Sequence, residues 1–554
     1  MVIKNYTKHV NTKVTPQSEP ILGKNQVKNS AGGFVFEVND FTKLERFLIL
    51  GTEGGTYYAS EKKLAQSNAS AVIRCIKTDG KRTLETIVSL SVNGRAPKND
   101  PAIFALGLCL KLGDLETRRL AAAAVPAVCR IGTHIFNLAE VVKGLGGWGR
   151  LTKKAFIGWY ESQKPDQLGL NLAKYQSRNG WSHRDLLRKA KPKPKHEFQL
   201  QSYRWAVGKL NDPKKSSGVP EGDKALSKEY LPKIIQGFEL AKKADTEKEI
   251  VELIKKYELP RECIPTQFLD SPKVWETLLM SGAGMPMTAM IRNLGKMSQV
   301  GLIAPLSTAS KYITDRLDNA PDLKRTRIHP ITLLMAQSVY RAGEGIKGSL
   351  KWKVDQNVAD ALDGAFYAAF GLVEPTDKRF LLALDVSSSM AGSTIAGTHL
   401  TPREGSAAMA LLTAKTEKRH HIVGFTSSNG RYDLTGMTEL NITPHQTLPQ
   451  AVKAISGLTF GGTDCALPML YAKSQNLDVD CFVIYTDSET WAGGIHPLQA
   501  LQQYRQATGI AAKLVVVGMV ANEFSIADPN DKGMLDVVGM DTNVPTILAD
   551  FVRQ

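Results

Sequence analysis

Oxygen-bearing side chains follow two short apolar runs in the C-terminal third of the chain. Three stand in a D-x-S-x-S pattern after the run 379–384, one follows the run 481–486, and a threonine follows the glycine pair 461–462. Carboxylate and hydroxyl oxygens are hard ligands that suit Mg2+, with Mn2+ as the other choice, and they need no histidine or cysteine. The candidate metal ligands are Asp385, Ser387, Ser389, Thr463 and Asp487.

The D-x-S-x-S pattern by itself has an ordinary structural alternative, because Asp and Ser after a strand often cap the next helix. The three-part arrangement favours metal binding over a capped site without metal. Hydrolysis at such a metal would also need a positioned general base. Glu489 and Asp464 are the nearest carboxylates and neither stands out from other surface acids. We therefore expect no enzymatic activity.

The elements that must position these ligands alternate between strand and helix. Apolar runs begin at residues 379, 421, 481 and 513, and helical patterns cover 403–416 and 497–507. This alternation predicts an α/β, doubly wound, open parallel sheet with helices on both faces. Ligands bind such sheets beyond the carboxyl ends of the strands. We expect residues 373–554 to form this domain.

Residues 40–372 show helical spacing instead. Apolar residues recur every three or four positions in 101–111 and 120–129, and further amphipathic segments follow at 246–256, 272–280 and 331–341. Many successive helices without strands suggest an all-α solenoid or ring. We assign residues 34–372 to this module and residues 1–33 to a polar lead-in. Prolines and small polar residues predict an exposed basic loop at 191–227.

The positive charge of the chain is concentrated in the helical module. The 554 residues carry 70 Lys and Arg against 54 Asp and Glu, a net charge of +16. Residues 1–372 hold 57 of the basic and 36 of the acidic residues, and the remainder holds 13 and 18. A basic surplus attracts phosphates. The 43% hydrophobic content excludes a mostly disordered or collagen-like chain.

A basic segment with interleaved aromatic residues runs from Lys174 to Lys215. Cations neutralise phosphates, and flat side chains stack on unpaired bases. The alternative is that Trp181 belongs to the core and the charges only solvate a face, with Ser182 capping a helix that starts at His183. The candidate nucleic-acid contacts, from charge and proximity, are Lys174, Arg178, Arg184, Arg188 and Lys189.

Cysteine use and hydropathy indicate a cytoplasmic protein. The six cysteines are far apart, form no C-x-x-C pair and are best explained as buried small hydrophobes. Residues 1–17 are polar and basic and lack the apolar core of a signal peptide. The most apolar stretches are too short to span a bilayer, so we expect no membrane partner.

Short motifs occur in one order along nearly the whole chain: Gly51–Tyr58, Cys129–His134, Trp148–Arg150, Arg178–Arg188, Arg292–Met297, Arg327–Pro330, Leu350–Trp352, Phe380–Met390, Gly461–Cys465, Thr486–Asp487, Gly493–Pro497 and Ile526–Pro529. In these motifs the chain resembles the Ro autoantigen family, whose members join a TROVE module to a von Willebrand factor A domain. The resemblance implies a multidomain fold: an all-α, HEAT-like helical-repeat ring closed by the α/β domain.

The resemblance also implies a metal-ion-dependent adhesion site. Ser387, Ser389 and Thr463 would ligate the metal directly, and Asp385 and Asp487 directly or through water. An open coordination position would accept the carboxylate of an acidic protein ligand. A metal-dependent interaction scaffold with incidental RNA binding is thus the alternative function.

For RNA the resemblance implies two binding regions. Small structured Y RNAs would bind an outer basic surface, and His183 lies in the motif linked to that role. Single-stranded 3′ ends of misfolded RNA would enter the ring, with Arg150, Arg292 and Lys296 as candidates at the inner rim. Bacterial members look like RNA quality-control adaptors for exoribonucleases such as polynucleotide phosphorylase. Residues 1–33 and 191–227 depart from the family pattern, which leaves the partner RNA open.

Overall fold

The computed structural model describes residues 14–554 except 53–55, 57–58, 209–229, 283, 346–348, 371–373, 396–399, 428–433, 457 and 459–460. Four expected features fall partly outside the described residues: the start of the lead-in (1–13), most of the basic loop (209–227), part of the motif that begins at Gly51, and the domain boundary at 372–373. The chain divides into two compact units, one of residues 73–94 and 99–369, and the other of residues 1–72, 95–98 and 370–554.

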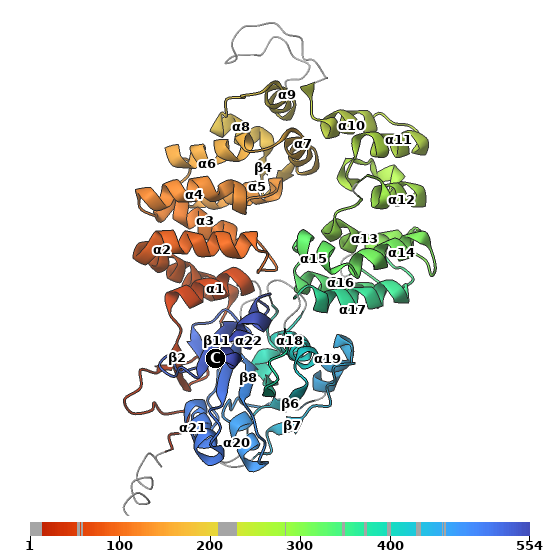
Figure 1. Ribbon diagram of the computed structural model, residues 1–554. Coiled ribbons are helices and arrows are strands. Elements are labelled where there is room, and N and C mark those ends of the chain that lie inside the picture. Colours follow the sequence, from red (N-terminus) through yellow and green to blue (C-terminus); the bar gives the residue numbers. More distant parts are fainter. Residues whose placement is uncertain are drawn as a thin grey trace, which may run out of the picture. The chain divides into compact units, whose positions relative to one another are not determined.

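The unit of residues 73–94 and 99–369 is almost entirely helical (Figure 1). Successive helices pack against one another, as α3 does on α4 and α5, and α16 on α17. The helices expected at 246–256, 272–280 and 331–341 are confirmed as α11, α12 and α16. No helix among the described residues is long and apolar enough to cross a bilayer. The bounds are α2 (Glu61–Val92, beginning in the other unit), α3 (Asp100–Leu112), α4 (Leu115–Val128), α5 (Gly132–Gly144), α6 (Arg150–Glu161), α7 (Pro165–Lys174), α8 (His183–Ala190), α9 (Glu197–Ala206), α10 (Lys233–Ala241), α11 (Glu247–Tyr257), α12 (Pro272–Met280), α13 (Met287–Gln299), α14 (Thr308–Leu317), α15 (Ala320–Thr326), α16 (Pro330–Ala342) and α17 (Gln356–Ala368).

The prediction of an exposed basic loop at 191–227 is wrong in part, because helix α9 occupies residues Glu197–Ala206. Gln199 and Ser202 of this helix are buried, and the Tyr203 ring meets Tyr160 edge-on at 5.8 Å. Of the prolines that suggested a loop, those at 192 and 194 stand before the helix begins. They therefore oppose helix formation only in the short connection between α8 and α9.

The second unit holds a six-stranded sheet in the order β11-β9-β8-β5-β6-β7. All neighbouring pairs are parallel except β6 and β7, so the expected open parallel sheet is confirmed with one antiparallel edge. Leu381 and Ala383 pack with α20 and α21 on one face, while Thr413 of α18 hydrogen-bonds Tyr485 on the other. Helices therefore cover both faces. The bounds are β5 (Arg379–Asp385), α18 (Pro402–Thr416), β6 (Arg419–Phe425), β7 (Met437–Glu439), α19 (Leu448–Ser456), α20 (Leu467–Ser474), β8 (Cys481–Thr486), α21 (Pro497–Thr508), β9 (Lys513–Gly518), β11 (Met534–Val538) and α22 (Val544–Arg553).

Residues 14–38 pack into this same unit, whereas we expected a polar lead-in up to residue 33. Strand β2 (Phe34–Glu37) pairs with β1 (Val27–Lys28) and with β10 (Phe524–Ser525). Val35 and Phe36 belong to the core of the sheet, and Arg46 of α1 (Asp40–Leu50) is fully buried against Asp536 at 2.7 Å. We call residues 14–38 the N-terminal strap.

Candidate metal centre and basic face

Two parallel strands bring the candidate metal ligands to one edge of the sheet. β5 ends at Asp385 and its neighbour β8 ends at Thr486, directly before Asp487. Parallel strands present their carboxyl ends at the same edge. The Thr486 hydroxyl donates to the second oxygen of Asp385 at 2.7 Å and ties the two strand ends together.

The serine hydroxyls lie beside these carboxylates. Ser387 and Ser389 have their Oγ atoms 3.1 Å apart, and Ser389 hydrogen-bonds Asp487. The Ser387 amide donates to Asp385 at 3.0 Å and closes a tight turn after the strand. Both serines and both aspartates are buried. Four of the five expected ligands therefore form one cluster.

Thr463 lies on a loop that is fastened to the loop of Asp487. Its carbonyl accepts hydrogen bonds from the amides of Trp491 and Ala492 at 3.0 and 3.1 Å. Thr463 is 1% exposed, and Cys465, two residues on, has its sulfur 3.7 Å from the Thr486 hydroxyl. The fifth candidate thus comes from a segment that meets the same sheet edge.

Burial makes the two carboxylates of this cluster costly to ionise. It raises the pKa of Asp385 above its ordinary range, and hydrogen bonds from Ser387 and Thr486 oppose that rise. For Asp487 burial raises the pKa, and the negative charges of Asp385 and Glu489 raise it further. Two buried carboxyls that repel one another are electrostatically suited to a cation between them.

The residues present fit a hard divalent cation. Every candidate donor is an oxygen, which suits Mg2+ or Mn2+ better than a soft metal. Ser488, next to Asp487, has a buried hydroxyl with no hydrogen-bond partner among the residues that the structure describes. The other nearby acids are engaged in the protein: Asp464 accepts from the Gln17 side chain at 2.7 Å, and Glu489 from the Ala31 amide at 3.0 Å. Both carboxylates are therefore held by residues of the N-terminal strap.

The basic segment of the helical unit contains a hairpin that we did not expect from the sequence. Strands β3 (Ser177–Arg178) and β4 (Trp181–Ser182) pair across a two-residue loop, in which Asn179 and Gly180 have φ angles of 50° and 74°. Asn-Gly is the typical pair for this left-handed turn, so the signal was present in the sequence. The turn leaves Arg178 exposed.

Helix α8 follows the hairpin and displays the other cations. The Ser182 hydroxyl accepts from the Asp185 amide, and the Asp185 side chain accepts from the Ser182 amide, which confirms Ser182 as the N-cap. Leu186 and Leu187 are buried, while Arg184 and Arg188, one turn apart, are exposed with Lys189. We call Arg178, Arg184, Arg188 and Lys189 the α8 basic face. Within the described residues its three arginines form no ion pair.

His183, expected in an RNA-binding motif, is a core residue with 3% exposure. Its Nε2 donates to the Asn171 carbonyl at 3.2 Å, so its Nδ1 accepts from the Tyr160 hydroxyl at 2.8 Å. Burial lowers the pKa of His183 to about 4. A direct contact with RNA is inconsistent with this placement, and His183 instead fixes the start of α8.

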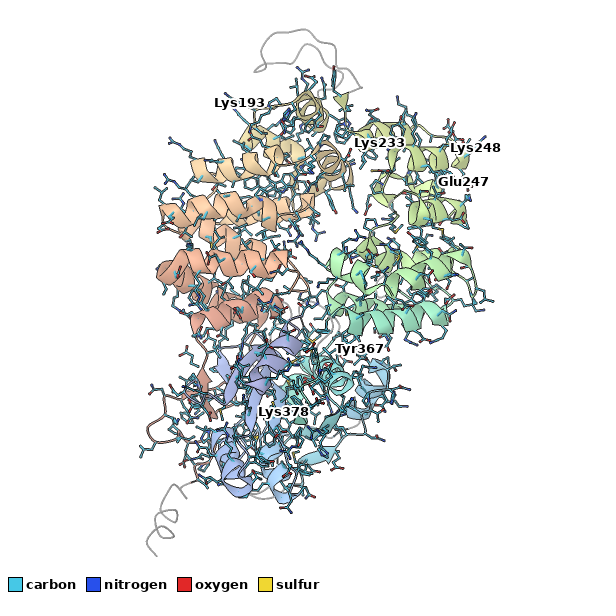
Figure 2. The ribbon with its side chains drawn as sticks, viewed as in Figure 1. Lys193, Lys233, Glu247, Lys248, Tyr367 and Lys378 are labelled. Atoms are coloured by element: carbon cyan, nitrogen blue, oxygen red, sulfur yellow. The ribbon has the colours of Figure 1, made fainter. Side chains whose placement is uncertain are left out.

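Two other residues of the basic segment are also used inside the protein. Trp181 is buried and donates to Glu140 at 2.8 Å, as the structural alternative expected. Lys174 is half-buried and lies 3.5 Å from Glu262, so part of its charge is already neutralised. Lys193, in the connection between α8 and α9, is exposed and extends the basic surface beyond the candidates that we named (Figure 2).

The three inner-rim candidates lie on two helices. Arg150 is the first residue of α6 and is exposed, as is Arg292 on α13. Lys296, one turn from Arg292, pairs with Asp270 at 2.7 Å. A common rim that includes α6 and α13 stays a prediction.

The chain matches two families: "TROVE domain" over residues 27–342 and "Ro60 vWA domain" over residues 379–552. It is 39% identical to "RNA-binding protein RO60" of Deinococcus radiodurans, covering 100% of this chain and 99% of the relative, and 38% identical to the Caenorhabditis elegans protein of that name, covering 98% and 92%. The crystal structure of the Deinococcus radiodurans RO (RSR) protein matches 93% of this chain and 99% of its own with a TM-score of 0.66 and 39% identity. The expected helical TROVE region and von Willebrand A domain are confirmed, and the chain belongs to the Ro60 family.

Proposed function

We propose that this chain is a non-enzymatic RNA-binding protein that acts in noncoding-RNA quality control. The observation that supports this best is the α8 basic face, whose cations are exposed on and beside a helix with a capped start. Arginines without an acidic partner lose little when they bind phosphate, since no existing ion pair has to break. The two relatives named RNA-binding proteins support the same function.

Two classes of RNA follow from the proposal. Small structured, Y-type RNA binds the α8 basic face, and single-stranded 3′ ends of misfolded RNA bind in the opening of a ring of helix pairs, near Arg150, Arg292 and Lys296. The protein then works in the cytoplasm as an adaptor for an exoribonuclease such as polynucleotide phosphorylase.

The metal centre has a separate part in this proposal. Asp385, Ser387, Ser389, Thr463 and Asp487 would hold Mg2+, and the bound ion would offer an open coordination position to the carboxylate of a protein partner. The side chains of these five residues supply the oxygens and exclude bulk water through their burial.

A binding and integrity assay tests the proposal. A gel-shift titration with a 5′-labelled structured RNA compares the wild-type protein with the double variant Arg184→Ala, Arg188→Ala. We expect a loss of roughly 30-fold, which is about 2 kcal/mol for two charge-assisted contacts. The control Lys62→Ala, Lys63→Ala removes an equal charge from exposed positions of α2 and should change the affinity less than about twofold.

The same assay separates binding from catalysis. The labelled RNA should stay at full length in the presence of Mg2+, because hydrolysis would need a positioned general base and the two nearby acids, Asp464 and Glu489, are already bonded to the N-terminal strap. Shortening of the RNA that is lost in Asp385→Ala would show a metal-dependent nuclease. Equal affinities of both double variants would remove the α8 basic face from the proposal.

A second candidate, a metal-dependent interaction scaffold, is favoured by one residue at the metal centre. Trp491 is 45% exposed, although its amide donates to the Thr463 carbonyl and its ring lies against Gly462. An exposed tryptophan beside a metal site suits a protein contact. Capture of a cellular protein that survives RNase but fails with a chelator or with Asp385→Ala would favour this function.

A further inference from the structure

We infer that Gln17 of the N-terminal strap is a positioning residue for the metal centre. The inference rests on the proposed Mg2+ site and adds a segment from the other end of the chain to it. Gln17 is fully buried at the place where the strap meets the loops of Thr463 and Asp487.

The side chain of Gln17 spans both ligand-bearing loops. Its Nε2 donates to the carboxylate of Asp464 at 2.7 Å and to the carbonyl of Ile495 at 2.8 Å. Its Oε1 accepts from the hydroxyl of Thr490. Both amide hydrogens and the amide oxygen are therefore satisfied, which a smaller or apolar side chain could not reproduce.

The backbone of Gln17 adds two more hydrogen bonds to those of its side chain. Its amide donates to the Gly493 carbonyl at 2.9 Å, and its carbonyl accepts from the Phe34 amide at 2.8 Å. Asp464 directly follows Thr463, and Thr490 stands three residues after Asp487. One residue of the strap thus fixes the distance between two segments that each supply a candidate ligand.

The second half of the strap holds the segment directly after Asp487. The Asn29 side chain donates to the carbonyls of Ser488 and Thr490 at 3.3 and 2.8 Å. Gly33 lies so close that a Cβ there would stand 1.9 Å from the Thr490 carbonyl oxygen. Ser488 has a φ of 60°, an uncommon conformation for a residue with a side chain, and the strap helps to hold it.

Mg2+ requires near-octahedral geometry, so small displacements of its ligands cost affinity. Outer residues that orient metal ligands typically change metal affinity 10- to 100-fold when they are replaced, by the general rule for such contacts. We therefore expect Gln17→Ala to weaken metal binding about tenfold or more while the sheet and the helical unit stay folded.

The test is Mn2+ binding to the full-length protein by isothermal titration calorimetry, well below the unfolding temperature of every variant. Gln17→Ala should raise the dissociation constant about tenfold or more. Lys24→Ala is the matched control, since Lys24 also lies in the strap but pairs with Asp528 at 2.6 Å, outside the loops of Thr463 and Asp487. It should leave the constant within about twofold.

A second variant covers the case in which Gln17→Ala does not fold. Asn29→Ala leaves Asp464 untouched and should still weaken Mn2+ binding several-fold, with faster amide exchange at residues 488–493. A purely structural role would lower the melting temperature but leave the dissociation constant for Mn2+ unchanged. That result in a folded variant would overturn the inference about Gln17 but not the proposed metal site. Failure of the wild-type protein to bind Mn2+ would overturn the proposed metal site together with it.

Discussion

The α8 basic face and the metal centre arrange charge in opposite ways. The basic face exposes its cations on a capped helix and leaves its arginines without acidic partners among the described residues. The metal centre buries two carboxylates beside one another and surrounds them with hydroxyls. Exposed cations cost little to keep charged and suit a large polyanion, whereas buried carboxylates are costly until a small cation neutralises them. The contrast fits the two binding functions that we propose, one for RNA and one for a divalent cation.

The largest expected effect separates these two functions. Asp385→Ala removes a carboxylate from the candidate metal centre and should weaken Mn2+ binding more than about 100-fold, since a carboxylate that holds the ion directly or through water contributes more than a residue that only orients ligands. Isothermal titration calorimetry measures this loss. RNA affinity by gel shift should change less than about twofold, because Asp385 is buried in the α/β unit. A parallel loss of RNA affinity would contradict two separate functions.

The next effect concerns the core beneath the basic face and depends on pH. Burial holds the pKa of His183 at about 4, below its ordinary 6.5. Between these values the unfolded chain takes up a proton that the folded chain does not bind. The stability contributed by neutral His183 is therefore complete above pH 6.5 and is lost as the pH falls toward 4. At pH 5 the loss is about 2 kcal/mol.

Urea unfolding followed by circular dichroism at pH 7.5 and pH 5 checks this value. His183→Gln keeps a donor and an acceptor but does not titrate. The fall in its free energy of unfolding from pH 7.5 to pH 5 should therefore be about 2 kcal/mol smaller than that of the wild-type protein. His134, whose pKa burial also lowers to about 4, is present in both proteins and cancels. An equal pH effect in both would show that His183 is not buried as a neutral base.

The smallest effect concerns the cap of α8. Ser182→Ala removes the hydroxyl of the capping box and should lower the free energy of unfolding by about 1 kcal/mol. RNA affinity should fall a few-fold, because the helix start that carries Arg184 frays. Thr246→Ala breaks the same capping box on α11 and should cost similar stability without changing RNA affinity. Equal RNA affinities of the two variants would show that the cap does not position the basic face.

Local patterns predicted the four central strands of the sheet, several of the helices and the grouping of the candidate metal ligands. Apolar runs gave β5, β6, β8 and β9, and because parallel strands end at one edge, the position of Asp385 relative to Asp487 followed from the sequence alone. The cap at Ser182 was equally local. Periodicity and capping depend on neighbours within a few residues, which a single sequence displays.

The remainder depends on contacts between distant residues. Gln17 binds Asp464 across 447 positions, and nothing in the polar sequence around Gln17 indicates such a partner. The family resemblance places His183 in an RNA-binding motif, but the helix start turns its ring toward Tyr160 and Asn171. Helix α9 was missed because the prolines before it dominated the pattern. Burial of a polar residue is a tertiary property.

The salt dependence of RNA binding tests the central claim most directly, namely that the α8 arginines bind RNA phosphates. Affinities of a structured RNA for the wild-type protein and for Arg184→Ala, Arg188→Ala are measured over a series of KCl concentrations. Each lost phosphate contact lowers the slope of log affinity against log salt by about 1, so we predict a slope smaller by about 2 in the variant. Identical slopes for the two proteins would contradict the account.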